Sequence, residues 1–254
     1  MNVSQRFRSI PPVTRNLIII NFLLWAVEMI FPGFARSALL PHLGLHYVGS
    51  TLFNPVQIIT YMFLHSPDSF LHIFFNMFTL WMFGPILEQV WGSKRFLLYY
   101  MVCGVGAALV QEGVWALTWK HDYVSAIAQL NGLTYDNMLA EVNKALAAGD
   151  GGFLNAVATF KNSIMTIGAS GAIFGLLLGF AFVFPDMPLY LFFIPVPIKA
   201  KWMVLGYAVL EFFLGISSTQ DTVAHFAHLG GLLFGLVMLL YWKKKGTLRG
   251  GRFY

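Results

Sequence analysis

The chain has 254 residues, of which 57% are hydrophobic and only 11% are charged. An average soluble domain is about 25% charged, so this composition, together with a mean hydropathy of +0.68, excludes an ordinary water-soluble globular protein. The formal net charge of +5 does not indicate nucleic-acid binding. Lys and Arg form short clusters at the ends of apolar stretches, and no basic face carries interleaved aromatic side chains.

Six apolar stretches approach the length of about 20 residues that a membrane-spanning helix needs. In chain order they are 16–34, 70–90, 96–117, 164–184, 202–216 and 223–242. The expected fold class is therefore an all-α polytopic membrane protein with six spans in one integral domain, 1–254. The first stretch follows basic residues as a signal peptide does, but no small-residue cleavage site follows Pro32, so we expect a retained span.

The positive side chains are divided unequally between the two sides that six spans create. Four lie on the side of the first outer segment: Arg36, Lys120, Lys144 and Lys161. Twelve lie on the side of both termini: Arg6, Arg8, Arg15, Lys94, Arg95, Lys199, Lys201, Lys243, Lys244, Lys245, Arg249 and Arg252. Because cytoplasmic loops carry the excess of Lys and Arg, both termini are expected to be cytoplasmic.

The segments between the spans give weaker predictions. The outer segment 118–163 contains a predicted surface helix over 135–148, ended by the Gly149–Asp150–Gly151–Gly152 sequence, with no catalytic role. The apolar stretch 189–198 is expected to be an interfacial loop, because Pro195 and Pro197 do not fit a helix interior. The single cysteine, Cys103, is expected to be a small packed residue.

The fourth span opens with GASGAIFG, from Gly168 to Gly175. A serine between small residues near a helix start has an accessible hydroxyl, and backbone N–H groups at a helix N-terminus can stabilise an oxyanion. By itself this sequence more often indicates simple close packing of helices. Ser170 is therefore a candidate nucleophile that needs a partner.

The sixth span supplies that partner in HFAHLGGLLFG, from His225 to Gly235. Gly171, Gly175 and Gly179 form one small-residue stripe, and Gly231 with Gly235 forms another. Two such stripes allow close helix approach, which would bring Ser170 and His228 to the same depth. A serine hydroxyl within hydrogen-bond reach of an imidazole is the minimum for an activated nucleophile.

The second span contributes His72 and Asn76 in the sequence LHIFFN. Their spacing of four places both on one helical face. Both side chains can donate to a developing oxyanion, although their spacing alone slightly favours an interhelical hydrogen-bond pair. Three spans that carry such residues at one depth favour a catalytic site over three separate structural roles.

Taken together, these segments resemble the rhomboid family of intramembrane serine proteases. GASGAIFG is similar to the family's serine motif, AHLGGLLFG to its histidine motif and HIFFN to its HxxxN motif. Their order matches the six-helix rhomboid core. TYMFLH, GSKRF and IPVPIKAKW are further likenesses, and the resemblance covers roughly residues 15–242 apart from the long outer loop 118–163.

The resemblance implies hydrolysis of peptide bonds in or beside the bilayer. Ser170 would attack the carbonyl, and His228 would take its proton and pass it to the leaving amine. The Ser170 N–H, His72 and Asn76 would form the oxyanion hole. Phe174 matches an aromatic that often packs on the catalytic imidazole. A dyad suffices in the family, and the sequence offers no third, acidic member.

The chain departs from the family in its first outer loop. Many rhomboids carry a Trp–Arg pair eight residues before a histidine that matches His65, and Val56 and Gln57 occupy those positions here. The pair is regarded as structural in the family, so the departure bears on the loop more than on catalysis. The long segment 118–163 would shape substrate access or cover the outer face.

The remaining polar residues are expected to be structural. His225 would stabilise the start of the sixth span, and Glu28, Glu88, Glu112 and Glu211 would have solvated or snorkelling roles. No spacing of His, Cys and carboxylates suggests a metal site, and no glycine loop suggests a nucleotide. No cofactor is expected.

Two other classes of function remain open from the sequence. A catalytically silent relative would bind membrane segments, and a transporter would carry polar residues along a route across the bilayer. As a protease, the chain would act on transmembrane proteins within the lipid bilayer, in an oligomeric state that the sequence does not reveal. The lack of an organelle-type presequence suits a bacterial inner membrane.

Overall fold

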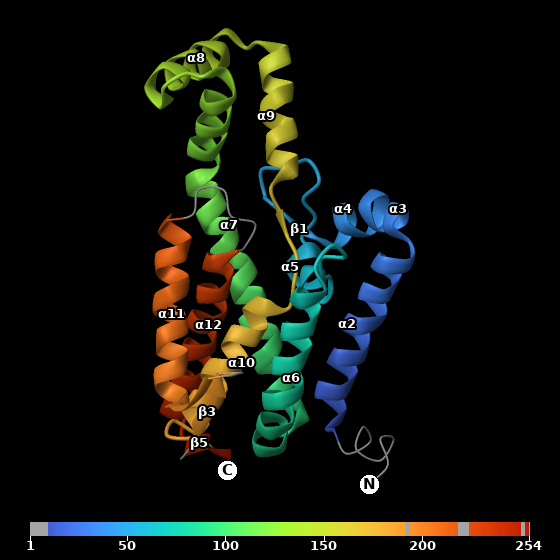
Figure 1. Cartoon of the computed structure of the whole chain (residues 1–254), viewed down its shortest axis with the longest axis vertical. Coiled ribbons are helices and arrows are strands. Elements are labelled where there is room, and N and C mark those ends of the chain that lie inside the picture. Colours follow the sequence, from blue (N-terminus) through green and yellow to red (C-terminus); the bar gives the residue numbers. More distant parts are fainter. Residues whose placement is uncertain (1–9, 192–193, 218–223, 250–251, 254) are drawn as a thin grey trace.

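The computed structural model describes residues 10–191, 194–217, 224–249 and 252–253, which form a helical bundle with a helical hairpin rising from one end (Figure 1). The helices are α2 Pro12–Ile30, α3 Pro32–Phe34, α4 Leu40–Leu43, α5 Gln57–Thr60, α6 Phe70–Trp91, α7 Ser93–Asn131, α8 Tyr135–Ala148, α9 Gly151–Ser163, α10 Ser170–Val183, α11 Ala200–Ser217 and α12 His225–Lys244, with a π-helical turn at Ala35–Leu39 and a 3₁₀ turn at Tyr61–Phe63. The strands are β1 Leu45–His46, β2 Met165–Thr166, β3 Pro188–Leu191, β4 Ile194–Lys199, β5 Leu248–Arg249 and β6 Arg252–Phe253.

Five of the helices within the described residues are long and apolar enough to cross a membrane: α2, α6, α7, α11 and α12. The prediction of an all-α polytopic membrane protein is therefore confirmed. The fourth predicted span corresponds to α10, which is apolar but has only 14 residues. At 1.5 Å per residue it rises about 21 Å, less than the hydrocarbon thickness of about 30 Å.

Two predicted span boundaries are wrong. The fourth span was expected from residue 164, but Met165 and Thr166 form β2, which pairs with β1. Gly168 then adopts φ 131, which no helix contains, so α10 begins at Ser170. The third span was expected to end at residue 117, but α7 continues for 39 residues to Asn131.

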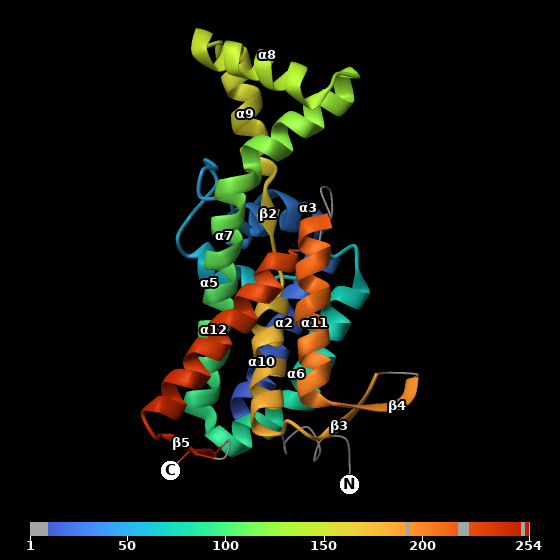
Figure 2. The same ribbon diagram turned by 90° about the vertical axis from the view of Figure 1, so that its left-hand side faces the viewer.

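The long outer segment forms a helical hairpin with a core of its own. The end of α7 packs with α8, the helix predicted at 135–148, and with α9 around Tyr123, Val124, Met138 and Val142. Asp150 caps α9 by accepting a hydrogen bond from the Phe153 N–H. Figures 1 and 2 show the hairpin rising away from the bundle rather than lying flat over its outer end.

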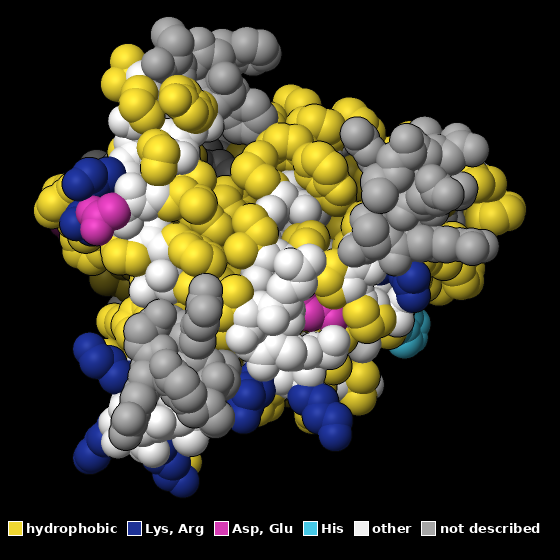
Figure 3. All heavy atoms as spheres, turned by 90° about the horizontal axis from the view of Figure 1, so that it is seen from below, with side chains coloured by type: hydrophobic (Ala, Val, Ile, Leu, Met, Phe, Trp, Pro, Cys, Tyr) yellow, Lys and Arg dark blue, Asp and Glu magenta, His cyan; other side chains and the backbone are white. Residues whose placement is uncertain are grey.

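The opposite end of the bundle carries the first and last described elements of the chain. Figure 1 shows the start of α2 and strand β5 together at this end, and Figure 3 shows Lys and Arg side chains around it. Arg6 and Arg8, which belong to the predicted positive side, lie outside the described residues. The start of α2 and the strand after α12 therefore lie at the same end of the bundle.

The stretch predicted as an interfacial loop is instead an antiparallel hairpin of β3 and β4. Figure 2 shows it projecting beside the base of α11. Proline is tolerated because a two-stranded hairpin has outer edges at which no N–H is needed. Asp186, just before the hairpin, pairs with Lys199 at 3.2 Å and Lys201 at 2.8 Å.

The glycine stripes bring α10 against α12 as predicted, although only in part. A Cβ at Gly231 would overlap the backbone of Gly171, so these two helices touch at that point. Gly179 and Gly235 instead face Tyr99 of α7. The two stripes therefore diverge, and α7 packs into the space between their inner ends.

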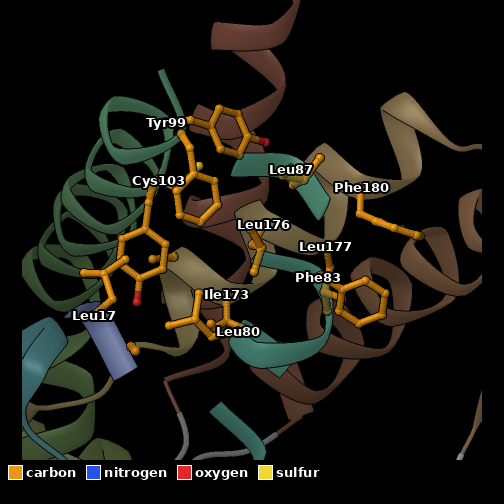
Figure 4. Close-up of a cluster of buried hydrophobic side chains, with 14 of the residues drawn as sticks. Leu17, Leu80, Phe83, Leu87, Tyr99, Cys103, Ile173, Leu176, Leu177 and Phe180 are labelled. Carbon is orange, nitrogen blue, oxygen red and sulfur yellow. The ribbon is translucent and has the colours of Figure 1, made fainter. Parts of the chain in front are cut away.

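The main core fills the centre of the bundle, where α6, α7 and α10 meet. Figure 4 shows Leu80, Phe83, Cys103, Leu176 and Phe180 among its side chains. Cys103 is a buried free thiol, as predicted. The Tyr99 hydroxyl donates to the Gly175 carbonyl at 2.8 Å, which satisfies a polar atom where helices are closely packed.

All four carboxylates expected to be solvated or snorkelling have specific partners, and those of Glu211 belong to the candidate site. Glu88 is buried and accepts from the Thr14 N–H at 2.7 Å, the Thr14 hydroxyl at 2.8 Å and the Ser93 hydroxyl at 2.6 Å. Glu28 is buried near the His65 N–H at 3.3 Å, and Glu112 accepts from the Val48 N–H at 2.8 Å. The expectation was wrong because depth along a helix does not reveal which face a side chain lies on.

Gln57, which stands where many rhomboids have arginine, organises the first outer loop. Its side chain is fully buried and accepts from the His46 N–H at 3.2 Å and the Asn54 N–H at 3.1 Å. Its amide donates to the Leu52 carbonyl at 2.9 Å and the Pro41 carbonyl at 3.1 Å. One amide thus ties four points of the loop together.

Candidate active site

Ser170 is the first residue of α10, and the strained turn before it determines where its hydroxyl lies. Gly168 has φ 131, and a Cβ at this position would stand 2.7 Å from Nε2 of His72. Its N–H donates to the Tyr61 carbonyl at 2.9 Å. The chain therefore passes very close to His72 just before the helix starts, which only glycine permits.

Ser170 and His228 are in direct contact. Ser170 Oγ lies 2.8 Å from Nε2 of His228, although the two residues are 58 positions apart. His228 is in the first turn of α12, and the α10–α12 contact at Gly171 and Gly231 holds the two helix starts together. This is the geometry in which an imidazole can accept the proton of a serine nucleophile.

Phe174 lies one turn after Ser170 and covers the imidazole. Its ring is stacked on that of His228, with centroids 4.3 Å apart and an angle of 6° between the planes. The stack restricts rotation of the imidazole about its side-chain bonds. Phe174 therefore has the position that the family resemblance implies for it.

His72 faces Ser170 from α6 with a defined protonation pattern. Its Nδ1 lies 3.4 Å from the N–H of Ser66, which donates to it. The proton of the neutral imidazole is therefore on Nε2, the atom next to Gly168. His72 thus offers a donor at the start of α10.

Asn76 lies on the same face of α6 and lines the same cavity as Ser170. Its amide nitrogen donates to the His72 carbonyl at 2.9 Å, within its own helix. One of its two amide hydrogens is therefore used within the helix. Asn76 thus lines the site together with His72.

All five of these residues line a cavity of about 620 Å³. Its wall includes Ser66 and Ser69 before α6, Thr166 of β2 and Ala224 before α12. A cavity of this size accommodates water and several residues of an extended peptide. Ser170, in a short helix that starts below the outer end of its neighbours, reaches solvent by this route.

Glu211 is the residue that sequence reasoning misassigned. It lies on α11 with its side chain only 12% exposed, and its Oε2 is 2.6 Å from Nδ1 of His225 and 3.0 Å from Nδ1 of His228. The second contact is close enough for an ion pair but is not aligned as a hydrogen bond. A carboxylate in an apolar span at the depth of two histidines was the signal available in the sequence.

Glu211, His225 and His228 also form a group whose ligand atoms lie within 4.8 Å of one another. Histidine nitrogens and a carboxylate are suitable zinc ligands. The spacing in the sequence did not predict this group, because Glu211 belongs to a different helix from the two histidines.

His65 lies in the loop before α6 and is fully buried beside His72, with ring centroids 5.0 Å apart. Burial, and secondly the neighbouring His72, lower the pKa of His65 from 6.5 to about 3. The imidazole is therefore neutral at physiological pH. Burial also lowers the pKa of His46 in the same outer loop.

Two comparisons with known proteins bear on this arrangement. A family model described as "Rhomboid domain" matches residues 52–119 and 142–245. These ranges include His72, Asn76, Ser170, Glu211 and His228. They omit residues 120–141, which contain the end of α7 and the start of α8.

Curated relatives of the same kind are more distant. The chain is 26% identical over 193 residues to "Rhomboid protein 1, mitochondrial" of Saccharomyces cerevisiae. This alignment covers 75% of this chain and 43% of the relative. It is 26% identical over 204 residues to "Rhomboid-like protein 11, chloroplastic" of Arabidopsis thaliana. That alignment covers 72% of this chain and 51% of the relative. The chain thus spans about half the length of the curated relatives it matches. The family match extends over more than half of the chain and coincides with the helices that carry the site, and on that basis this multi-pass membrane protein belongs to the rhomboid family.

Proposed function

We propose that this chain is an intramembrane serine endopeptidase that cleaves transmembrane proteins in or near their membrane segments. The observation that carries the proposal is the 2.8 Å contact between Ser170 Oγ and His228 Nε2. A protein that only binds membrane segments does not need a serine hydroxyl aligned with an imidazole. The family membership supports the same activity.

In the first step Ser170 Oγ attacks the scissile carbonyl and His228 Nε2 takes the hydroxyl proton. Negative charge develops on the carbonyl oxygen. The Ser170 N–H at the start of α10, Nε2–H of His72 and the amide of Asn76 are proposed to stabilise it. Each such donor contributes about 3–4 kcal/mol of transition-state stabilisation.

His228 then gives its proton to the leaving amine, which departs and leaves an ester on Ser170. A water molecule from the cavity attacks this ester while His228 again acts as the base. The carboxyl product leaves, and the proton returns to Ser170. A substrate helix must unwind locally before this sequence starts, because its carbonyls are otherwise held in backbone hydrogen bonds.

The proposed architecture is a single integral domain over 1–254 with both termini on the positively charged, cytoplasmic side. The two relatives are named for the mitochondrion and the chloroplast, so the comparisons do not support the expected bacterial inner membrane. Orientation is testable because the native Cys103 is buried. A cysteine introduced at Asn143 on the outer hairpin should react with an impermeant maleimide in intact cells, and one introduced at Lys245 should not.

The activity is tested by incubating the purified protein with a single-span substrate, in detergent and in lipid vesicles. We expect cleavage by the wild type that Ser170→Ala and His228→Ala both abolish. Ser37→Ala in the π-helical turn and His42→Ala in α4, both at exposed positions, are matched controls and should cleave normally. Cleavage that survives loss of Ser170 or His228 contradicts the dyad, and a wild type inactive toward several substrates in both media favours the silent binding protein.

A further inference from the structure

Glu211 holds a buried negative charge against the imidazole that the proposed dyad uses. The side chains of Glu211 and His228 are 12% and 11% exposed, with Oε2 and Nδ1 3.0 Å apart. A carboxylate in an apolar span is costly unless it is paired. Here it lies on the side of the imidazole that faces away from Ser170.

The protonation states of the cluster are mutually consistent. His228 Nε2 must be free of a proton to accept one from Ser170, so the proton of the neutral ring is on Nδ1. Nδ1 lies 3.0 Å from Oε2 of Glu211, close enough for an ion pair but without the alignment of a hydrogen bond. The carboxylate accepts from Nδ1 of His225 at 2.6 Å, which holds it in place between the two rings.

The other neighbours of His228 do not supply a negative charge. Phe174 covers its face from α10, His72 approaches from α6 and His225 precedes it on α12. Among the described residues around the ring, Glu211 is the group that can balance an imidazolium. The position of Glu211 on α11 follows from the same helical face that buries Ala200 and Val204 against the bundle.

We propose that Glu211 is a positioning residue for His228 and extends the dyad to a Ser170–His228–Glu211 arrangement; this inference rests on the serine-protease function proposed above. The carboxylate keeps the Nδ1-protonated form of His228 facing Ser170 and stabilises the imidazolium that forms during attack. Glu211 takes no proton itself, because the proton moves from Ser170 to Nε2 and then to the leaving amine. His225 orients the carboxylate.

Glu88 offers a matched control for the substitution. It is also a buried carboxylate in a spanning helix, but its partners are Thr14 and Ser93 at the opposite end of α6 from His72. Glu88→Gln and Glu211→Gln therefore make the same chemical change in a similar environment. Only the second removes charge from the His228 contact.

The experiment measures kcat and KM for a single-span substrate, the rate of Ser170 labelling by a fluorophosphonate, and the thermal midpoint. In labelling, Ser170 Oγ bonds to phosphorus, fluoride leaves and His228 takes the proton, so the rate reports activation of the serine without peptide binding. Glu211→Gln should lower kcat and the labelling rate about 10- to 100-fold and leave KM within about twofold. Glu211→Asp, which keeps the charge on a shorter side chain, should be intermediate, and Glu88→Gln should lower the thermal midpoint while kcat stays within about twofold.

A folded Glu211→Gln with wild-type kcat and labelling rate overturns the inference and leaves the proposed function intact. If Glu211→Gln does not fold, Glu211→Asp decides, because wild-type kcat in that variant also overturns it. A wild type that neither cleaves nor labels fails the proposed function and this inference with it. Activity that EDTA abolishes and Zn²⁺ restores would assign Glu211, His225 and His228 to a metal, whereas the proposal expects EDTA to have no effect.

Discussion

Phe174 stacks on the imidazole of His228 with ring centroids 4.3 Å apart and planes 6° from parallel. Both rings come from the first two turns of their helices, close to the backbone contact of α10 with α12 at Gly171 and Gly231. The stack leaves the two ring nitrogens of His228 directed sideways, one toward Ser170 and one toward Glu211. The orientation of the proposed base is thus determined from three helices.

Replacement of Phe174 by Ala should lower kcat about two- to tenfold, because an aromatic pair contributes about 0.5–1.5 kcal/mol beyond its burial and the imidazole would gain rotational freedom. Phe174→Tyr retains the ring and should keep kcat near the wild-type value. Steady-state cleavage of a single-span substrate measures both. An Ala variant with unchanged kcat and an unchanged thermal midpoint would contradict a positioning role for the stack.

Replacement of Gly168 by Ala should abolish most of the activity. At φ 131 an L-residue is strained, and the added Cβ would stand 2.7 Å from His72 Nε2. Displacing the Nε2–H of His72, a proposed oxyanion donor, should lower kcat/KM by at least about 100-fold.

Gly113→Ala is the control for Gly168→Ala, because nothing lies within 4 Å of a Cβ at Gly113 in α7. It should leave activity unchanged and the thermal midpoint equal or higher, since alanine favours a helix over glycine. Equal activities of the two variants would show that activity does not depend on the close approach of His72 to the start of α10.

Replacement of Glu88 by Ala should destabilise the fold by about 2–4 kcal/mol. The change leaves the buried Thr14 N–H and hydroxyl and the Ser93 hydroxyl without their acceptor. Thr14→Ser keeps the hydroxyl and should cost much less. Thermal unfolding in detergent compares them, and an Ala variant as stable as Thr14→Ser would show that this end of the bundle does not depend on the carboxylate.

Acidification should destabilise the protein through His65. Burial, with a smaller effect of His72, lowers the pKa of His65 to about 3, compared with 6.5 when it is exposed. Between these values the unfolded chain binds a proton that the folded chain does not, so stability falls as pH decreases below 6.5, by at most about 1.4 kcal/mol per pH unit. Stability from this group is fully present above pH 6.5.

The thermal midpoint measured from pH 7.5 to pH 5 tests this dependence. His65→Gln removes the titrating group and should flatten the decline. His42→Gln, at an exposed position, should leave the slope of the wild type. Parallel slopes in all three proteins would mean that another group governs the acid sensitivity.

Much of this protein was determined by the sequence alone. Runs of apolar residues specify spanning helices because the bilayer leaves no alternative partner for backbone polar groups, and all six predicted spans correspond to helices. Small-residue spacing placed Ser170 and His228 at one depth, since glycines let helix backbones touch. Those patterns are local, so they can be read along the chain.

Other features were decided only by the tertiary structure. The pairing of β1 with β2 shortens α10. Glu88 is buried because Thr14 of α2 lies against it, and Glu211 is buried because His228 of α12 lies against it. Each depends on a contact between residues far apart in the sequence, which no periodicity along one helix encodes. The sequence thus determined which segments form apolar helices and which residues could react, and the packing of α6, α10, α11 and α12 decided which side chains lie together around His228.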